Sequence, residues 1–369
     1  MKTSKCIILL MIIFLGAGLS EASAQQPVRI AVAGITHGHV PWILGREKKP
    51  DIELAGIYEA DTALSRKYAA AYKLPLSLFY SNLTEMLTRV KPEGVVAFGS
   101  IFDHLAVVEA AAPLGIHVMM EKPLAVNAEH AERMKVLAEK HRIHILTNFE
   151  TSWYPSIHKT HQLISDSAVI GTFNRLVVHM GHQGPKEIGV SPEFFAWLTD
   201  PVQNGGGALT DFGCYGANIM TWLMNGEEPV SVTAVTKQYK PSIYPKVDDD
   251  ATIIISYANA ECIIQASWNW PFSRKDIAAY GTKGYLITED ARRMRMRIDE
   301  RSQEQSFVAE QELAEKHADP FRYFAGVIRG RIVVPEYGLY SLKNNVLSVR
   351  ILDAARRSAN SGKTVYFKD

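Results

Sequence analysis

Two short segments that lie far apart in the sequence carry the side chains best suited to chemistry. The first is Glu121-Lys122-Pro123, and the second runs from Gly205 to Tyr215, opens with three glycines and contains Asp211. A lysine ammonium lowers the pKa of a neighbouring hydroxyl, and a tyrosine can exchange a proton with that hydroxyl. Brought together over a nicotinamide ring, a lysine, an aspartate and a tyrosine could remove a proton and a hydride from an alcohol carbon.

The second segment predicts a helix that begins after a flexible turn. Residues 205–207 are glycines, which tolerate positive φ and close backbone approach. Asp211, Tyr215 and Asn218 then follow at i, i+4 and i+7, on one face of the helix. Tyrosine has an unperturbed pKa of about 10, so we expect the ammonium of Lys122 and the helix N-terminus to favour its phenolate. The alternative is an aromatic side chain packed between helix and sheet.

Strands and helices alternate along the first part of the chain, in the order expected for elements that position such residues. The predicted strands are 28–33, 52–58, 94–99, 116–120 and 143–149, and the predicted helices are 62–72, 105–114 and 128–141, with a helix-like stretch from about Val40. This order predicts an α/β domain with a doubly wound parallel sheet. Ligands of such sheets bind at the carboxyl ends of the strands, where Lys122 follows the fourth strand.

The pattern changes after residue 148, where short strands follow one another. A helix is predicted at 156–165, strands at 172–182, 230–239, 252–257, 262–268, 277–280, 285–288 and 293–298, and a last helix at 342–361. Consecutive short strands joined by tight turns indicate a large, mostly antiparallel open sheet in an α+β domain. We therefore predict a nucleotide-binding domain at residues 25–148 and a second domain at residues 149–369.

The turn after the first strand predicts a dinucleotide site. It reads Gly34-Ile35-Thr36-His37-Gly38-His39, which keeps the first glycine of G-x-G-x-x-G and places Thr36 and His39 at the other two positions. We expect Gly34, Thr36, His37, Gly38 and His39 to contact the cofactor.

The end of the second predicted strand carries a carboxylate that bears on which dinucleotide binds. Glu59 can accept both ribose hydroxyls of NAD and would repel the 2′-phosphate of NADP, so NAD is favoured over NADP. The alternative for Glu59 is a solvated strand end.

The two histidines of this turn raise the question of a metal. His37 and His39 are two residues apart, and no third ligand stands near them in the sequence. Two imidazoles without a third ligand are weak evidence for zinc. We therefore predict no metal site and assign both histidines to the cofactor cleft.

Aromatic and polar residues of the second domain are candidates for substrate contacts. Aromatic faces suit the C–H face of a sugar and polar tips suit its hydroxyls. The predicted substrate residues are Trp153, Tyr154, His182, Lys186, Trp197 and Asn218. Trp268 and Trp270 are assigned to the core or to the rim of the site.

The first 24 residues predict a Sec-type signal peptide. Lys2 and Lys5 precede the apolar run 7–15, and Ala22-Ser23-Ala24 places small residues before a cleavage point. We expect export to the periplasm or another extracytoplasmic compartment and no membrane contact after cleavage; the alternative is an uncleaved anchor.

Composition indicates a soluble globular protein. The chain is 47% hydrophobic and 21% charged with a formal net charge of +1, which argues against nucleic acid as a partner. Two cysteines after residue 24, Cys214 and Cys262, form no disulfide framework, and we expect buried free thiols.

These motifs resemble those of the Gfo/Idh/MocA oxidoreductases, which include glucose–fructose oxidoreductase and inositol dehydrogenase. The likeness covers nearly all of the chain after the leader and is strongest at residues 121–123, at residues 205–215 and at His104. Most members have histidine where Tyr215 stands, whereas the glucose–fructose oxidoreductase branch has tyrosine with asparagine three residues later, as here. Two departures are the altered glycine turn and Phe98-Gly99-Ser100, which replaces the usual Thr-Pro-Asn.

The resemblance implies a Rossmann NAD-binding domain followed by an α+β domain for substrate and oligomerisation. It implies an NAD-dependent enzyme that oxidises a hydroxyl of a sugar, cyclitol or related polyol, with Lys122, Asp211 and Tyr215 in the reactive roles. It also implies a homo-oligomer packed through the open face of the second sheet. Further cofactor contacts are expected from Gly99, Ser100, His104, Glu121 and Lys122.

Two other functions remain open at the level of sequence. Free NAD is scarce outside the cytoplasm, so an exported enzyme could keep its NAD and recycle it, as a redox-neutral glycosidase or a sugar–sugar oxidoreductase. The altered glycine turn also fits a carbohydrate-binding protein that has lost its chemistry.

Overall fold

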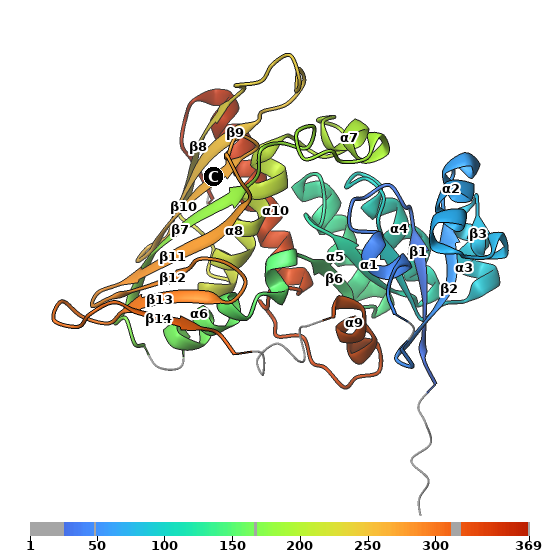
Figure 1. Cartoon of the computed structure of the whole chain (residues 1–369), viewed down its shortest axis with the longest axis horizontal. Coiled ribbons are helices and arrows are strands. Elements are labelled where there is room, and N and C mark those ends of the chain that lie inside the picture. Colours follow the sequence, from blue (N-terminus) through green and yellow to red (C-terminus); the bar gives the residue numbers. More distant parts are fainter. Residues whose placement is uncertain (1–25, 48, 166–167, 311–318, 368–369) are drawn as a thin grey trace, which may run out of the picture.

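We analysed a computed structural model of the protein, which describes residues 26–47, 49–165, 168–310 and 319–367. The predicted signal peptide lies outside these residues. Two sheets lie at opposite ends of the molecule, and most of the helices lie between them or around the first sheet (Figure 1). No helix in the described ranges is long and apolar enough to cross a membrane.

The first sheet is parallel and doubly wound, as predicted. Its strands are β1 (Val28–Ala33), β2 (Ile52–Tyr58), β3 (Phe79–Tyr80), β4 (Gly94–Ala97), β5 (His117–Glu121) and β6 (Ile145–Asn148), in the order β3-β2-β1-β4-β5-β6. The strand order reverses between β1 and β4, which is where ligands of open α/β sheets bind.

Helices surround the first sheet, and some of them begin at side-chain caps. They are α1 (Pro41–Leu44), α2 (Thr62–Tyr72), α3 (Leu83–Val90), α4 (His104–Ala111) and α5 (Ala128–His141), with 3₁₀ turns at Leu76–Leu78 and Ala112–Leu114. Asp61 caps α2 and Asn127 caps α5 by accepting backbone N–H groups of the first turn. The helix expected from Val40 is only one turn long, because it ends at Gly45.

The second sheet has nine strands and is mostly antiparallel, as predicted. They are β7 (Phe173–Gly181), β8 (Ser231–Lys237), β9 (Asp250–Ser256), β10 (Glu261–Ser267), β11 (Arg274–Gly281), β12 (Tyr285–Thr288), β13 (Arg293–Arg297), β14 (Gln305–Val308) and β15 (Val365–Tyr366). The order is β14-β13-β12-β11-β7-β10-β9-β8-β15, and the central pair β10 and β7 is parallel. Side chains alternate between buried and half-exposed along β9 and β10, so one face is covered.

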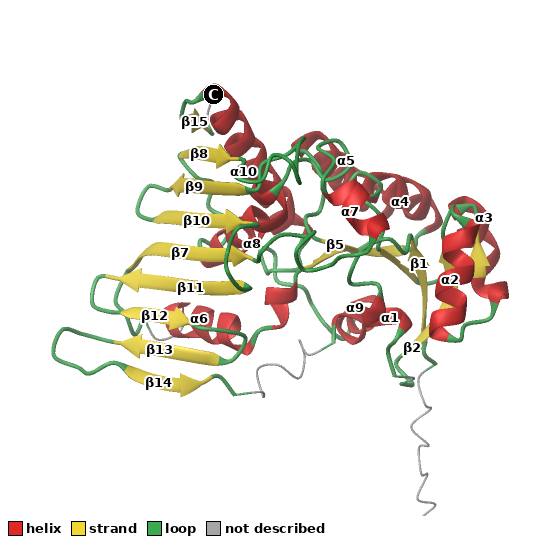
Figure 2. Cartoon of the chain, turned by 45° about the horizontal axis from the view of Figure 1, so that its top comes forward, coloured by secondary structure: helices red, strands yellow, loops and turns green. Residues whose placement is uncertain are grey.

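Helices α6 (Pro155–Ser165), α8 (Ala208–Leu223) and α10 (Leu342–Ser361) cover the inner face of this sheet (Figure 2). Helices α7 (Pro192–Leu198) and α9 (Pro320–Ile328) lie nearer the first sheet, and a 3₁₀ turn spans Glu150–Trp153. Of these, α8 packs on β10 and α10 packs on both α8 and β8. The helix α10 ends at Gly362 in a left-handed conformation with φ 67°.

The last part of the chain returns to the first sheet. Phe321 and Phe324 of α9 belong to the same buried cluster as Val28 and Ile30 of β1. The helix α10 also contacts α5. The predicted boundary after residue 148 lies between β6 and the following 3₁₀ turn, but packing does not divide the chain there into two independent segments.

Candidate active site

Lys122 and Asp211 form a buried ion pair between the two domains. Lys122 directly follows β5, after which the Lys122–Pro123 peptide bond is cis, and Asp211 lies in the first turn of α8. The Lys122 ammonium contacts the Asp211 carboxylate and donates to the Asp211 carbonyl oxygen at 3.0 Å. The two residues are 6% and 5% exposed, so water does not screen the pair.

Trp268 completes the coordination of the Asp211 carboxylate. Its Nε1–H donates to Asp211 Oδ2 at 2.9 Å, and the indole is fully buried. Burial raises the pKa of Asp211, but the charge of Lys122 and the hydrogen bonds lower it by a larger amount. The pKa therefore lies below its usual value, and the carboxylate is ionised. Burial lowers the pKa of Lys122, but the charge of Asp211 outweighs this effect. The pKa of Lys122 is therefore raised, and the ammonium stays protonated. The sequence offered no signal for this role of Trp268.

Tyr215 lies one turn after Asp211 on α8, with both lysines of the site near its ring. The Nζ atoms of Lys122 and Lys275 are 5.2 and 5.7 Å from the ring centroid. The residue is 2% exposed and packs edge-on against Phe149. Burial raises its pKa well above the usual value, and the charge of Glu150 adds to this. Burial therefore favours the neutral phenol over the expected phenolate. We call Lys122, Asp211, Tyr215 and Trp268 the reactive cluster.

Lys275 and Glu150 were missed by sequence reasoning. They form an ion pair, and the hydroxyl of Tyr154 donates to Glu150 Oε1 at 2.6 Å. Lys275 lies within β11, where alternation predicts only a half-exposed strand residue, so no pattern marks it. Tyr154, a predicted substrate residue, is thus hydrogen-bonded to the ion pair of Glu150 and Lys275 near Tyr215.

His182 lies at the end of β7 beside the reactive cluster. Its ring packs edge-on against Phe212 of α8 with centroids 5.0 Å apart, and its Nδ1 accepts the N–H of Gly184 at 2.9 Å. Burial lowers its pKa to about 4, and the positive charge of Lys122 acts in the same direction. A neutral imidazole therefore lines the site at neutral pH.

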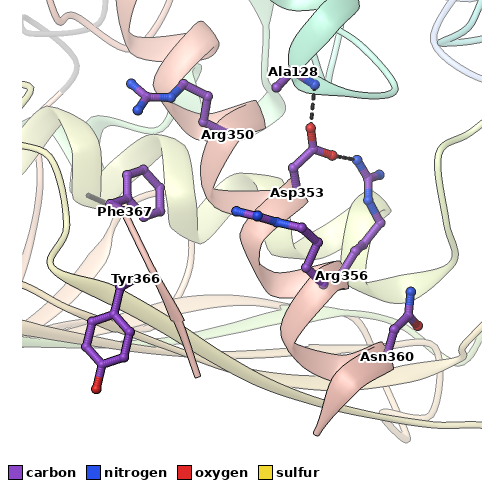
Figure 3. A pocket seen from close by; sticks show the side chains of 8 residues that line it. Ala128, Arg350, Asp353, Arg356, Asn360, Tyr366 and Phe367 are labelled. Carbon is purple, nitrogen blue, oxygen red and sulfur yellow. Dashed lines mark hydrogen bonds and ion pairs between the residues drawn. The ribbon is translucent and has the colours of Figure 1, made fainter. Parts of the chain in front are cut away.

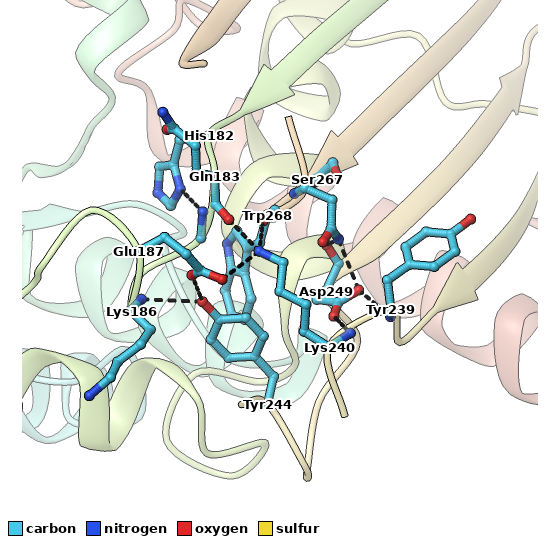
Figure 4. Close-up of polar contacts among 12 residues, drawn as sticks. His182, Gln183, Lys186, Glu187, Tyr239, Lys240, Tyr244, Asp249, Ser267 and Trp268 are labelled. Carbon is cyan, nitrogen blue, oxygen red and sulfur yellow. Dashed lines mark hydrogen bonds and ion pairs between the residues drawn. The ribbon is translucent and has the colours of Figure 1, made fainter. Parts of the chain in front are cut away.

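The loop after His182 is anchored by a polar network (Figure 4). Lys240 contacts Glu187 at 2.6 Å and donates to the carbonyl oxygen of Trp268 at 2.8 Å. The hydroxyl of Tyr244 contacts Glu187 and accepts the backbone N–H of Lys186 at 3.2 Å. The Lys186 ammonium lies 5.8 Å from the ring centroid of Phe195 in α7, and its predicted contact with substrate stays a prediction.

Asn218 does not share the face of Asp211 and Tyr215 that faces Lys122. Its amide donates to Leu339 O at 2.8 Å and to Asn344 Oδ1 at 2.9 Å, inside the contact between α8 and α10. The prediction failed because α8 is buried on nearly every side, so its helical periodicity does not identify one cleft-facing side.

The glycine turn, residues 34–39, follows β1 at the same sheet edge. Gly34 has φ 77°, and a Cβ there would lie 2.7 Å from the backbone N of Gly99, so only glycine fits. Glu59 is 8% exposed and accepts the N–H groups of Ile35 and Asp61, which excludes a solvated strand end.

Helix α7 packs directly on the glycine turn. Trp197 Nε1 donates to Thr36 Oγ1 at 3.1 Å, and the Phe194 ring lies 4.8 Å from the ring of His37. Phe194 also occupies the space next to Gly38, 3.1 Å from where a Cβ would stand. Trp197 was predicted to contact substrate, and the structure places it against the turn instead.

The turn and its neighbours fit a dinucleotide. Among the described residues the backbone N–H groups of Thr36 and Gly38 have no acceptor, which leaves two donors for phosphate oxygens. Glu59 stands at the end of β2, the position that holds a ribose in such folds. His104 Nε2 is fully buried without a partner in the described part of the chain. Gly99 contacts Gly34, and Ser100 donates to Asp103 at 2.6 Å.

Glu121 connects the glycine turn to β6. Its Oε2 lies 3.0 Å from His39 Nδ1, and its Oε1 accepts Asn148 Nδ2 at 2.7 Å. Trp153 Nε1 in turn donates to Asn148 Oδ1 at 2.8 Å, and its ring stacks on Tyr340. Trp153 is thus a support for Glu121 in this geometry, and its predicted contact with substrate stays a prediction.

The cysteines and Trp270 take no part in the ion pairs of the site, although the Cys214 thiol donates to the Asp211 carbonyl oxygen at 3.2 Å. Cys214 and Cys262 are buried thiols, as expected. Trp270 is half-buried with Arg274 over its ring at 4.6 Å. A pocket of about 540 Å³ opens along α10, lined by residues that include Asp353 and Arg356 (Figure 3), and it holds none of the predicted site residues.

Comparison with known sequences identifies both parts of the chain. Residues 28–149 match the profile of an oxidoreductase family with an NAD-binding Rossmann fold, and residues 157–287 match the GFO/IDH/MocA C-terminal domain. The chain is 26% identical over 237 residues to trans-1,2-dihydrobenzene-1,2-diol dehydrogenase of Xenopus laevis, covering 64% of this chain and 67% of that protein. It is 23% identical over 279 residues to D-xylose 1-dehydrogenase [NADP(+)] of Haloarcula marismortui, covering 73% and 74%.

Solved structures share the fold. An inositol dehydrogenase homologue from Azotobacter vinelandii complexed with NAD+ has a TM-score of 0.79 at 17% identity and covers 93% of this chain and 98% of its own. An aldose–aldose oxidoreductase from Caulobacter crescentus complexed with glycerol has a TM-score of 0.75 at 20% identity and covers 93% and 100%. These likenesses show that the fold is shared, with a parallel Rossmann sheet followed by a mostly antiparallel sheet.

Proposed function

The chain belongs to the Gfo/Idh/MocA oxidoreductase family, and from this premise we propose that it is an exported NAD-dependent enzyme acting on a hydroxyl of a sugar, cyclitol or related polyol. The observation that carries the proposal is the buried ion pair of Lys122 and Asp211 beside Tyr215. Related proteins include a xylose dehydrogenase and a levoglucosan dehydrogenase, which supports this substrate class.

The residues of the reactive cluster divide the work of proton transfer and charge stabilisation. NAD, when bound, supplies the hydride acceptor at C4 of its nicotinamide. Tyr215 is a neutral phenol in the ligand-free protein and can donate its proton to a carbonyl oxygen. In the oxidative direction its phenolate accepts the proton of the substrate hydroxyl, and the ammonium groups of Lys122 and Lys275 favour that phenolate. Lys122, held by Asp211, stabilises negative charge on the substrate oxygen.

A second candidate function is a redox-neutral cycle with NAD held in place. It is favoured by α7, which packs on the glycine turn through Trp197 and Phe194 and would have to move for dinucleotide to leave past it. The predicted export of the chain points the same way, because cofactor is scarce outside the cytoplasm. The cycle fits a glycosidase or a sugar–sugar oxidoreductase.

Glu59 supports NAD rather than NADP as the cofactor. Its carboxylate is fixed by two backbone N–H groups at the end of β2, where a 2′-phosphate would meet negative charge. The D-xylose dehydrogenase relative uses NADP(+), so relatives as a whole do not decide this preference.

A homo-oligomer through the outer face of the second sheet completes the proposal. Ile254, Ile263 and Val177 are paired across β9, β10 and β7 and lie in one half-exposed row on the face without helices. A row of apolar side chains across an open sheet is suited to packing against a second copy.

The test is to identify the small molecule that co-purifies with the mature protein. We expect nicotinamide dinucleotide by mass and absorbance, and its reduction when sugars and polyols are added. Turnover of sugars without added NAD would select the redox-neutral cycle. Protein that neither contains nor binds NAD, and reduces none with any sugar or polyol, would contradict the proposal.

A further inference from the structure

Three metal-binding side chains meet where the glycine turn faces the end of β5. His37 and His39 come from the turn, and Glu121 is the last residue of β5. One ligand atom from each lies within 4.8 Å of the other two, and His39 Nδ1 is 3.0 Å from Glu121 Oε2. The third ligand that the sequence lacked near the histidines is therefore supplied from 82 residues away.

This donor set and its spacing suit zinc. Two imidazoles and one carboxylate form the protein ligands of several catalytic zinc sites, which keep a fourth position open. With metal–ligand bonds of about 2.0–2.2 Å, ligand atoms around a tetrahedral ion are about 3.3 Å apart. The His39–Glu121 separation of 3.0 Å lies close to this value, and the other two separations are at most 4.8 Å. Side-chain adjustments of about 1.5 Å or less would therefore close the site around an ion.

Neighbouring residues orient the carboxylate as they do at metal sites. Asn148 donates to Glu121 Oε1 and is itself held by Trp153 Nε1, which leaves Oε2 directed at His39. Such outer hydrogen bonds fix ligand orientation and are typical of built metal sites. The arrangement spans β5, β6 and the 3₁₀ turn after β6, so three elements support one oxygen atom.

The Glu121 carboxyl group is buried, and the nearest lysine is engaged elsewhere. Glu121 is 1% exposed and His37 is 3% exposed, whereas the side chain of His39 is 23% exposed. A buried carboxylate is stable only when it is paired or bound to a metal. The adjacent ammonium of Lys122 is already taken by Asp211. That leaves either the ring of His39 or an ion between the three ligands.

We propose that His37, His39 and Glu121 bind a divalent cation of the zinc class, with a fourth position for an oxygen ligand. The site goes beyond the proposed hydride transfer and does not depend on it. His37 Nδ1 accepts the backbone N–H of His39 at 3.0 Å, so coordination by this ring exchanges one neutral hydrogen bond for a metal–nitrogen bond.

The test is zinc binding by the full mature chain, purified without a histidine tag and stripped with a chelator. Wild type is expected to bind one zinc, measured by mass spectrometry of the metal and by titration. His39→Gln and Glu121→Gln each remove a ligand and are expected to weaken zinc binding by at least about 100-fold. Asn148→Ala removes the outer hydrogen bond and is expected to weaken it by about 10- to 100-fold.

A second histidine pair in the same sheet provides the matched control. The rings of His117 and His144 stack with centroids 5.0 Å apart, and His117 Nδ1 accepts the N–H of His144, much as at the turn. No carboxylate completes a metal cluster there within the described residues. His117→Gln is therefore expected to keep the zinc of wild type.

Cobalt substitution tests the site on wild type alone, in case a variant does not fold. The strong visible absorption of four-coordinate Co²⁺ is expected, and only the weak bands of hydrated Co²⁺ would overturn the proposal. Zinc absent from wild type, or kept equally by His39→Gln and Glu121→Gln, would overturn it too. Protein that holds zinc but never NAD would contradict the proposed function and leave this site standing.

Discussion

The reactive cluster and the glycine turn lie at the same sheet edge, yet they satisfy their polar groups differently. In the reactive cluster, Lys122, Asp211 and Trp268 compensate one another through direct bonds from three distant segments. In the glycine turn, imidazoles and the aromatic side chains of α7 fill the space, and two backbone donors have no acceptor among the described residues. The charges of the reactive cluster are therefore compensated within the protein, whereas the turn keeps backbone donors that a bound phosphate can satisfy.

Removing the lysine should have the largest effect and would show how tightly the reactive cluster is compensated. Lys122→Met leaves the Asp211 carboxylate buried without its cation, so we expect the free energy of unfolding to fall by about 3–5 kcal/mol. We also expect kcat/KM to fall by about 10²–10³-fold or more. Arg89→Met breaks an exposed ion pair with Glu85 and should cost less than about 0.5 kcal/mol in denaturant unfolding.

Tyr215→Phe removes only the phenol oxygen, which has no hydrogen bond to the described residues. We expect kcat to fall by about 10²-fold or more while stability stays within about 1 kcal/mol of wild type. Tyr239→Phe, at an exposed position, is the control. Equal kcat for Tyr215→Phe and wild type would remove Tyr215 from the mechanism.

Lowering the pH should reduce the free energy of unfolding through His182, which lies beside the reactive cluster. The pKa of its imidazole is about 4 in the folded protein, against 6.5 for an unperturbed histidine, so only the unfolded chain gains a proton between these values. Stability contributed by neutral His182 is present above pH 6.5 and is lost as the pH falls towards 4, by about 3 kcal/mol. His182→Asn should lose correspondingly less stability over this interval, as measured by denaturant unfolding at each pH. Parallel curves for the two proteins would contradict this.

Trp268→Phe tests the hydrogen bond that the neutral indole donates to Asp211 in the reactive cluster. The change keeps an aromatic ring but removes the N–H that donates to Asp211 Oδ2. A hydrogen bond to a buried charged group contributes about 1.5–3 kcal/mol, so we expect stability to fall by that amount. Trp270→Phe loses only a long contact to Met180 O at 3.4 Å and should change stability by less than about 1 kcal/mol.

The smallest effect is expected at the glycine turn. Trp197→Phe removes the hydrogen bond to Thr36 while the ring packing on His37 is kept. We expect the packing of α7 on the glycine turn to become less stable by about 1 kcal/mol. Bound NAD should then be released roughly fivefold faster in stopped-flow measurements. Thr36→Val should give the same change, and the double variant should add little to either. Unchanged release would show that α7 does not retain the cofactor.

The sequence predicted the elements whose ends are marked by local chemistry. The bounds of α2, α5 and α10 agree with prediction because Asp61, Asn127 and Ser341 cap their first turns. Helices α3, α7 and α9 were not predicted although Asn82, Ser191 and Asp319 cap them, because each is too short for its apolar period to repeat clearly. The parallel pairing of β7 with β10 also lies beyond local pattern, because some eighty residues separate the strands.

The residues of the candidate site were likewise predicted where a local motif marks them and missed where none does. Lys122, Asp211 and Tyr215 were predicted from their motifs, and the structure brings them together. Trp268 and Lys275 were missed because each sits in or beside a β-strand whose pattern reports only burial. The contact of His39 with Glu121 joins residues that share no local spacing, so only the assembled sheet edge reveals it.

The most direct test of the central claim is a single-turnover measurement of nicotinamide reduction by a sugar in the mature protein. The reactive cluster predicts that bound NAD is reduced rapidly in wild type and in Tyr239→Phe, and at least about 10²-fold more slowly in Tyr215→Phe and Lys122→Met. Equal rates in all four proteins, each carrying bound NAD, would contradict the account, because hydride transfer would then occur without the phenol and the ammonium.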